Sequence, residues 1–369
     1  MTIPFSTIVK NLPATTPFVG PETLERQQGK VFNARIGANE SAFGQSPLAV
    51  AAMREAVAES HWYADPENYE LRQALAQIHN VEIDEICVDA GIDSLLGLTV
   101  RMLIEPGQSV VTSHGAYPTL NYHVAGFGAN LVTVPYRNCH EDPDALIAAA
   151  REHQAKLVYL ANPDNPMGTW HTADTLTQMI NKLPDNCVFA LDEAYIEFAE
   201  AVIAPPIDTS NPQVIRYRTF SKAYGMAGQR IGYVIAHKDI ITGFNKIRNH
   251  FGINRIAQRG ALASLQDNSF LPNVRAAVSA ARTKVTEFVH GHGFTSLPSS
   301  TNFVAVNVGS TEAAQHMIAE LNKRQVFMRM PFVEPLNQYI RVGLGSDTEH
   351  RVFELAFNEI VMQSSFIKD

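Results

Sequence analysis

The chain has 369 residues, of which 46% are hydrophobic and 18% are charged, and its formal net charge is −8. This length suits two domains with sizeable cores, and the composition is ordinary for a globular enzyme, which excludes a largely disordered chain. The mildly acidic balance argues against nucleic acid or an anionic membrane as the main partner.

Cysteine usage and the N-terminus indicate a reducing compartment. Cys87, Cys139 and Cys187 are widely spaced and form no CxxC pair, so we expect neither a disulfide framework nor a metal site. The stretch from Met1 to Gly20 contains three prolines and no long apolar run, so it does not resemble a signal peptide. No uncharged apolar stretch reaches the roughly 20 residues that a membrane helix needs. We therefore expect a cytoplasmic protein that binds no membrane.

Up to about residue 250, short apolar runs alternate with helical patterns. The runs that predict buried strands are Ile86–Val88, Ser109–Thr112, Leu131–Val134, Lys156–Leu160, Val188–Leu191, Val214–Tyr217 and Ile231–Ala236. Helices are predicted between them at Ser94–Ile104, Asp144–His153 and Thr172–Leu183. This alternation predicts an α/β domain with a mostly parallel sheet covered by helices. Ligands of such sheets bind beyond the carboxyl ends of the strands.

The pattern changes after residue 250 and predicts a second, smaller α+β domain. Helices are expected at Arg255–Gln266, Asn273–His290, Thr311–Arg324 and Asp347–Met362, and strands at Asn302–Val308, Val326–Arg329 and Tyr339–Val342. We therefore expect an N-terminal arm at residues 1–32 that joins the small domain, a large domain at 33–255 and a C-terminal small domain at 256–369.

Two loops after predicted strands carry polar residues suited to a ligand. Ala90-Gly91-Ile92-Asp93-Ser94 starts a helix, and its backbone N–H groups suit an anion, although helix capping alone would also explain it. The absence of a GxGxxG pattern disfavours a dinucleotide enzyme. Asn162-Pro163-Asp164-Asn165-Pro166-Met167-Gly168 is either a tight loop or a rigid support for an asparagine aimed at a ligand oxygen.

Asp192 ends an apolar run and needs a cationic partner, because burial of a bare carboxylate is costly. One interpretation is a magnesium-binding carboxylate of a nucleotidase, which requires a GxxxxGK[ST] loop. The chain has a single Gly-Lys pair, Gly29-Lys30, which is followed by valine and lacks the first glycine of that loop. The other interpretation is a carboxylate that pairs with the protonated pyridine nitrogen of pyridoxal 5′-phosphate (PLP), which requires a lysine nearby.

The segment from Thr219 to Arg230 reads Thr-Phe-Ser-Lys-Ala-Tyr-Gly-Met-Ala-Gly-Gln-Arg and supplies such a lysine. Its hydroxyls, glycines and arginine are the groups that bind a phosphate. Lys222 lies among them, and a partly desolvated amine near cations loses its proton more easily, as Schiff-base chemistry requires.

These segments, in this order, resemble the fold-type-I PLP aminotransferases, most closely the histidinol-phosphate aminotransferase branch. The resemblance runs from about Asn33 to Gly343 and includes the spacing from Lys222 to Arg230. It implies the PLP-dependent transferase (aspartate aminotransferase-like) fold. It also implies a transaminase that moves an amino group from an amino acid or an amino-alcohol phosphate to an oxo acid such as 2-oxoglutarate.

The resemblance implies a role for each matching residue. Lys222 would hold the cofactor and move the proton, Asp192 would pair with the pyridine nitrogen, and Tyr195 and Asn165 would bind the ring oxygen. Tyr117 would stack on the ring. The cofactor phosphate would be held by Gly91, Ile92, Asp93, Thr219, Ser221 and Arg230, and by Tyr63 of a second subunit, which implies a homodimer. The substrate would be bound by Asn39, Arg329 and Arg341.

The sequence departs from the family at Phe18, where the family often has a tyrosine that binds the substrate phosphate. An aromatic or other amino-acid aminotransferase is therefore an alternative. A PLP-dependent decarboxylase of amino-acid phosphates resembles the same branch and is a further alternative. A non-catalytic PLP-sensing module is less favoured, because only about thirty residues precede the match, too few for a helix-turn-helix domain.

Overall fold

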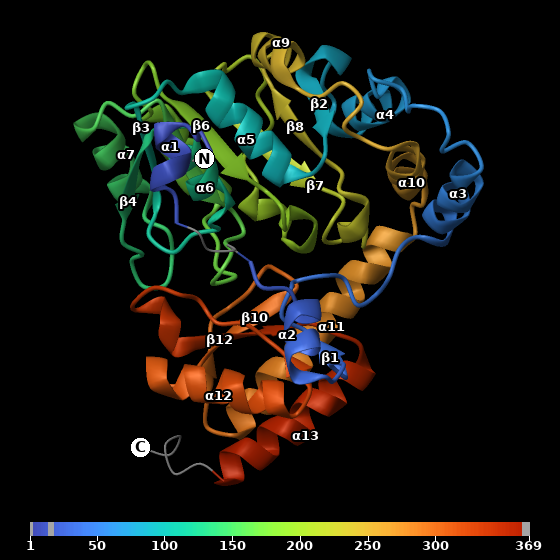
Figure 1. Cartoon of the computed structure of the whole chain (residues 1–369), viewed down its shortest axis with the longest axis vertical. Coiled ribbons are helices and arrows are strands. Elements are labelled where there is room, and N and C mark those ends of the chain that lie inside the picture. The colour runs from blue at the N-terminus through green and yellow to red at the C-terminus, as the bar shows by residue number, and fades with distance from the viewer. Residues whose placement is uncertain (1–2, 14–17, 364–369) are drawn as a thin grey trace.

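The computed structural model describes residues 3–13 and 18–363. The expected N-terminal arm and small domain therefore extend in part outside the described residues. Figure 1 shows a larger part built around one sheet and a smaller part below it, with the long helix α11 (Phe270–Gly291) running from one to the other.

The larger part contains a sheet that, within the described ranges, has seven strands in the order β2-β8-β7-β6-β5-β3-β4. Neighbouring strands pair in parallel except at β8, which is antiparallel to both β2 and β7. The expected mostly parallel α/β sheet is therefore confirmed. The strands are β2 (Ile86–Asp89), β3 (Ser109–Ser113), β4 (Asn130–Val134), β5 (Leu157–Ala161), β6 (Val188–Asp192), β7 (Val214–Thr219) and β8 (Gly232–Ala236).

Helices cover both faces of this sheet, so its central strands are buried on both sides. Along β5, Leu157 and Tyr159 pack into one core with α5 (Ile92–Leu103), α6 (Thr119–Gly126) and α9 (Lys238–Ile247). The alternating residues Val158 and Leu160 pack against α7 (Pro143–Glu152) and α8 (Ala173–Asn181) on the other face. This double burial explains why the strand sequences are continuous apolar runs.

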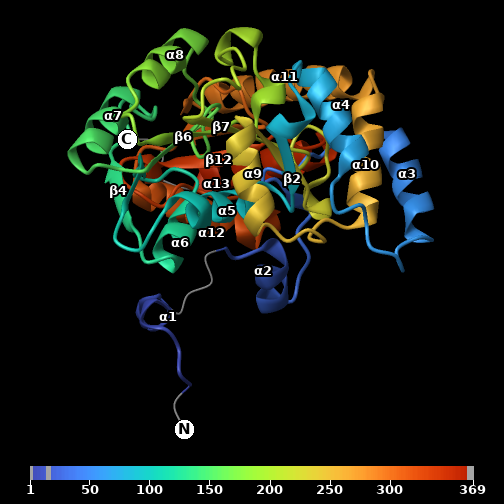
Figure 2. The ribbon, with the colours of Figure 1, turned by 90° about the horizontal axis from the view of Figure 1, so that it is seen from above.

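A third group of helices packs around β2 and β8. It consists of α3 (Pro47–Val57), α4 (Tyr69–His79) and α10 (Arg255–Gln266). Figure 2 shows this group at the opposite end of the molecule from α7 and α8. The N-terminal helices are α1 (Thr7–Asn11) and α2 (Pro21–Gln28), and the 3₁₀ turns lie at Ile83–Glu85, Ile196–Phe198, Ala201–Ile203, Ala227–Gln229 and Leu336–Gln338.

The smaller part has its own hydrophobic core and two small sheets. In one sheet β10 pairs antiparallel with both β9 and β12, and in the other β1 pairs in parallel with β11. The elements are β1 (Ala34–Arg35), β9 (Thr295–Ser296), β10 (Phe303–Asn307), β11 (Val326–Phe327) and β12 (Tyr339–Gly343), with α12 (Thr311–Lys323) and α13 (Asp347–Gln363).

The hydrophobic cores assign some residues to a different part of the molecule than the domain boundaries expected at residues 33 and 256. Ala34 and Ile36 lie in the core of the smaller part, whereas Ala257 and Ala261 of α10 pack with the larger part. Val274 and the rest of α11 return to the smaller core. The two-domain division remains a prediction, and packing places the change of core between α10 and α11.

A buried charge cluster fixes the start of the loop after β6. The Glu193 carboxylate accepts hydrogen bonds from Arg216 and Arg218 of β7, and Glu193 and Arg216 are almost inaccessible to solvent. Burial alone would raise the pKa of Glu193, but the two guanidinium groups lower it to about 2. The carboxylate is therefore ionised at neutral pH and holds the chain directly after Asp192.

We expect Glu193→Gln to lower the free energy of unfolding by about 3–5 kcal/mol, because it leaves two buried guanidinium groups without a countercharge. Urea unfolding followed by circular dichroism measures the change. The matched control is Glu70→Gln, whose partner Arg259 is exposed; it should cost less than about 1 kcal/mol. Equal effects of the two substitutions would contradict a structural role for the buried cluster.

Candidate active site

A cavity of about 1140 Å³ lies between the two parts and is lined by residues of both. From the sheet it takes Ala161, Asp192 and Thr219, which are the last residues of β5, β6 and β7. From the smaller part it takes Arg329 and Arg341. The carboxyl ends of parallel strands thus form one wall, as expected for an α/β sheet.

Asp192 forms a buried anionic floor of the cavity. Its carboxylate accepts hydrogen bonds from the Tyr159 hydroxyl at 2.7 Å and from the Ala194 N–H at 2.9 Å. Burial raises the pKa of Asp192 to about 6, although both hydrogen bonds favour the ionised form. A carboxylate in this position is suited to a cationic N–H group of a ligand.

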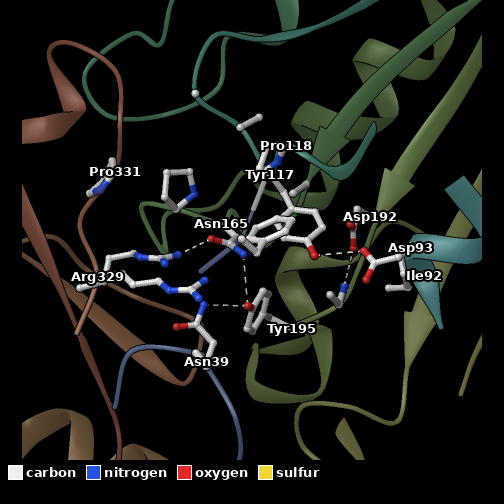
Figure 3. Close-up of a pocket in the computed structure, with 18 of the residues that line it drawn as sticks. Asn39, Ile92, Asp93, Tyr117, Pro118, Asn165, Asp192, Tyr195, Arg329 and Pro331 are labelled. Carbon is white, nitrogen blue, oxygen red and sulfur yellow. Dashed lines mark hydrogen bonds between the residues drawn. The ribbon is translucent and has the colours of Figure 1, made fainter. Parts of the chain in front are cut away.

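Lys222 lies in the loop that follows β7, close to Tyr195. Its Nζ lies 5.5 Å from the centroid of the Tyr195 ring and donates to the Asn39 carbonyl oxygen at 3.2 Å. The hydroxyl of Tyr195 accepts from the side-chain amides of Asn39 at 3.0 Å and Asn165 at 3.4 Å (Figure 3). Asn39 is buried and its Oδ1 has no hydrogen-bond partner among the described residues, so a polar acceptor remains available at the cavity wall.

Asn165 is held by the loop after β5. The buried Asp164 carboxylate accepts from the Tyr136 hydroxyl and from the Met167 N–H, which fixes the loop from behind. The Asn165 Oδ1 accepts a hydrogen bond from the Arg341 guanidinium at 2.6 Å. The loop therefore presents one amide to Tyr195 and to the arginine of β12 at the same time.

Two arginines of the smaller part face the cavity. Arg329 and Arg341 form a β-bridge, so their side chains come from adjacent backbone positions. Arg329 donates to the Val19 carbonyl oxygen at 2.8 Å, and among the described residues neither arginine forms an ion pair with a carboxylate. Burial lowers the pKa of Arg341 to about 10, which leaves it protonated at neutral pH. This wall is suited to an anionic ligand.

The residues expected at the phosphate converge at the N-terminus of α5. The Arg230 guanidinium contacts the Ser221 hydroxyl at 3.5 Å and the Asp93 carboxylate at 3.3 Å. Gly91 has φ +86°, and a Cβ at this position would lie 2.9 Å from the Arg230 guanidinium. The Thr219 hydroxyl accepts from the Ser221 N–H and orients that residue. Helix N–H groups, a hydroxyl and a guanidinium together form a cup for an anion.

Tyr117 lies between this anion cup and the cavity mouth. Its hydroxyl donates to Asp93 at 3.0 Å (Figure 3), and burial, with the nearby Asp93 charge, raises its pKa. At the mouth the Phe18 ring stacks on Tyr117 with centroids 6.2 Å apart and also contacts Tyr122 edge-on. The departure of the sequence at Phe18 therefore puts an apolar ring at the cavity mouth.

Tyr63 is placed differently from the other predicted residues. Its side chain is 78% exposed, packs on Phe251, and does not line the cavity. The remaining predicted residues line the cavity, except Gly91, which lies behind Arg230. The contact that Tyr63 is expected to make with a second subunit stays a prediction.

Two cavity features are not predicted by the sequence analysis. Tyr159 bonds to Asp192 from the next strand, and the loop Met330–Val333 closes one side of the cavity. Gly115, with φ +99°, lies against Val333 so closely that a Cβ there would overlap the valine side chain. No local sequence signal marks either feature.

No group of three or more His, Cys, Asp or Glu side chains within the described ranges is arranged to hold a metal ion. In the same part of the chain, no helix combines the length and apolar character needed to cross a membrane.

Comparisons with known proteins agree with this geometry. The family model for aminotransferase class I and II matches residues 34–354. A histidinol-phosphate aminotransferase from Anaeromyxobacter sp. (strain Fw109-5) is 36% identical over 78% of this chain and 81% of its own. One from Nitrosococcus oceani is 32% identical over 90% of both chains.

Among solved structures, histidinol-phosphate aminotransferase from Sinorhizobium meliloti in complex with pyridoxal 5′-phosphate is similar over 98% of both chains, with 44% identity and a TM-score of 0.95. A Thermus thermophilus aspartate aminotransferase mutant, 20% identical with a TM-score of 0.82 over 97% of this chain and all of its own, shares the fold. The expected fold and family are confirmed: the chain belongs to the class I and II aminotransferases and is similar to the histidinol-phosphate aminotransferases.

Proposed function

We propose that this chain is a PLP-dependent transaminase that takes the amino group of histidinol phosphate and transfers it to an oxo acid such as 2-oxoglutarate. One observation carries the proposal: Lys222 and the buried Asp192 lie on one side of the cavity, and Arg329 and Arg341, without ion-pair partners among the described residues, lie on the other. Lys222 and Asp192, which suit the carbonyl group and the pyridine nitrogen of PLP, thus face two arginines that suit the anions of a substrate.

The residues present fit PLP. The anion cup of Gly91, Ser221, Arg230 and the α5 N-terminus matches a phosphate, and Asp192 matches a pyridine N–H. When bound, PLP supplies an electron-accepting ring that stabilises negative charge at the substrate α-carbon. Asp192 would hold the proton on the ring nitrogen, Tyr195 and Asn165 would bind the ring oxygen, and Tyr117 would cover one face of the ring.

Lys222 would act as the base. Its Nζ lies beside Tyr195 and bonds to a neutral carbonyl oxygen rather than to a carboxylate. From this position Lys222 would bind the cofactor, take the proton from the substrate α-carbon and later return a proton to complete the transfer.

Arg341 and Arg329 would bind the anions of donor and acceptor. Asn165 accepts from Arg341, so the position of the guanidinium is already set before a substrate arrives. Donor phosphate and acceptor carboxylate are both anions, so the same wall serves both halves of the reaction. The loop Met330–Val333 would exclude water from this side.

Tyr63 and its neighbour Trp62 are largely exposed apolar side chains outside the cavity, which supports a homodimer in which Tyr63 completes the phosphate site of the other subunit. We also propose a cytoplasmic enzyme, with an N-terminal arm and two domains that meet at the cavity.

An aromatic amino acid is the second candidate donor. The contact of Phe18 with Tyr117 and Tyr122 favours it, because three aromatic rings at the mouth offer apolar surface to a ring and no hydroxyl at position 18 to a phosphate. The donor is decided by single-turnover absorbance. We expect histidinol phosphate to bleach the cofactor absorbance faster than phenylalanine or glutamate; the reverse order would replace the donor and leave the transaminase class intact.

Lys222→Ala should abolish the covalent link to the cofactor, since no other amine would take its place. The link is fixed with borohydride, and the labelled peptide is identified by mass spectrometry. Lys246→Ala, on α9 outside the cavity, is the control and should keep the label. A borohydride-stable label in Lys222→Ala would show that the assignment is wrong.

Arg341→Gln should raise KM for the anionic acceptor about ten- to a hundredfold, because it removes a charge-assisted hydrogen bond. Steady-state kinetics with 2-oxoglutarate measures the change. Arg351→Gln, at an exposed position of α13, should leave KM within twofold. An unaltered KM in Arg341→Gln would remove Arg341 from the substrate site.

A further inference from the structure

His123 lies outside the cavity and contacts the helix turn that forms the anion cup. It belongs to α6, which begins two residues after Tyr117, and its Nε2 lies 2.9 Å from the backbone carbonyl oxygen of Asp93. Because a carbonyl oxygen only accepts, Nε2 must carry the proton and donate. The imidazole thus donates a hydrogen bond to the backbone of the first turn of α5, the turn that contains Ile92 and Asp93.

Gly97 makes room for this contact. An added Cβ at Gly97 would lie 2.6 Å from Cε1 and 2.8 Å from Nδ1 of His123, so the ring lies against the backbone of α5. Glycine inside a helix is unfavourable relative to alanine, and such a residue usually has a packing reason. Here the reason is the His123 ring, which packs against Gly97. Gly97 lies one helical turn after Asp93, whose carbonyl oxygen the ring binds.

The two helices are otherwise joined by apolar packing. Leu120 and Val124 of α6 and Leu95 and Leu96 of α5 are fully buried in one core, and both helices lie on the same side of the sheet in Figure 1. Apolar packing is non-directional. Two directional contacts orient the first turn of α5 relative to the segment from Tyr117 to α6: the Tyr117 hydroxyl donates to the Asp93 carboxylate, and His123 donates to the Asp93 backbone carbonyl oxygen. Of the two, the His123 bond holds the helix backbone itself.

We propose that His123 is a positioning residue for the cofactor phosphate: its bond to the Asp93 carbonyl holds the N–H groups of the α5 first turn in line with Ser221 and Arg230. The inference rests on the proposed function, since the anion in the cup is the phosphate of PLP. His123 itself touches neither cofactor nor substrate.

The test is calorimetric titration of the full chain, freed of cofactor, with pyridoxamine 5′-phosphate and with pyridoxamine. Pyridoxamine phosphate has no aldehyde and forms no bond to Lys222, so its affinity reports the non-covalent contacts. We expect His123→Leu to weaken its binding roughly three- to tenfold, the usual effect of one lost hydrogen bond, and to leave pyridoxamine binding unchanged. His123→Gln, which keeps an N–H donor, should stay within twofold of wild type.

Two further variants keep the test decisive if His123→Leu folds poorly. Gly97→Ala should push the imidazole from its place and weaken binding of pyridoxamine phosphate as His123→Leu does, and adding His123→Gln to it should restore affinity, because the flexible glutamine side chain avoids the methyl group. His153→Leu, at the exposed end of α7, is the matched control and should bind as wild type.

Three results would overturn the inference alone: wild-type affinity in His123→Leu, an equal loss for pyridoxamine and its phosphate, or a loss in His123→Gln as large as in His123→Leu. A wild-type chain that binds pyridoxamine phosphate no tighter than pyridoxamine would overturn the proposed cofactor, and the inference with it.

Discussion

The parallel register of β5, β6 and β7 is the constraint on which the site depends. Ala161 is the backbone partner of Asp192, and Asp192 that of Tyr217, two residues before the end of β7. Strand ends aligned in this way bring three loops to one place, where the Asn165 amide of the first loop donates to the Tyr195 hydroxyl of the second. The loop after β5 supplies Asn165, and the loop after β7 supplies Lys222. Their distance is therefore set by the pairing of the strands.

Charge is distributed over the cavity so that opposite groups do not cancel one another. Asp192 is hydrogen-bonded to a neutral tyrosine, and Arg341 to a neutral amide. Each charge is thus oriented by a dipole that does not neutralise it, and each remains available to a ligand. The carboxylate next in sequence, Glu193, shows the opposite solution: it is neutralised by two arginines and serves the fold. Adjacent acidic residues therefore have different tasks because they have different partners: Tyr159 for Asp192, and Arg216 and Arg218 for Glu193.

The sequence predicts those parts of the site in which chemistry and local pattern coincide. Lys222, Asp192 and Asn165 follow predicted strands, and most predicted strands and helices differ from the structure by a few residues at their ends. Tyr159 is not predicted, because a strand buried on both faces has no polar alternation to show which side chains face the ligand. The position of Phe18 beside Tyr117 is not predicted either, because the path of the N-terminal segment depends on tertiary contacts.

Backbone pairings between residues far apart in the sequence also cannot be predicted from local sequence patterns. The β-bridge between Arg329 and Arg341 forms across an irregular loop, and β1 has only two residues, too few for a periodicity. For the same reason the sequence assigns Ala34 to the large domain, whereas its side chain packs in the smaller core. Tyr63 remains a prediction, since its expected contact involves a second copy of the chain.

The close approach of Gly115 and Val333 has a mechanical consequence. Gly115 of the larger part has no side chain, and the Val333 side chain of the loop Met330–Val333 packs directly on its backbone. This contact limits how closely the two parts can approach each other. A side chain at position 115 would act as a spacer and hold the arginine wall away from the lysine. A glycine at position 115 is therefore what allows the loop with Val333 to lie this close to the larger part.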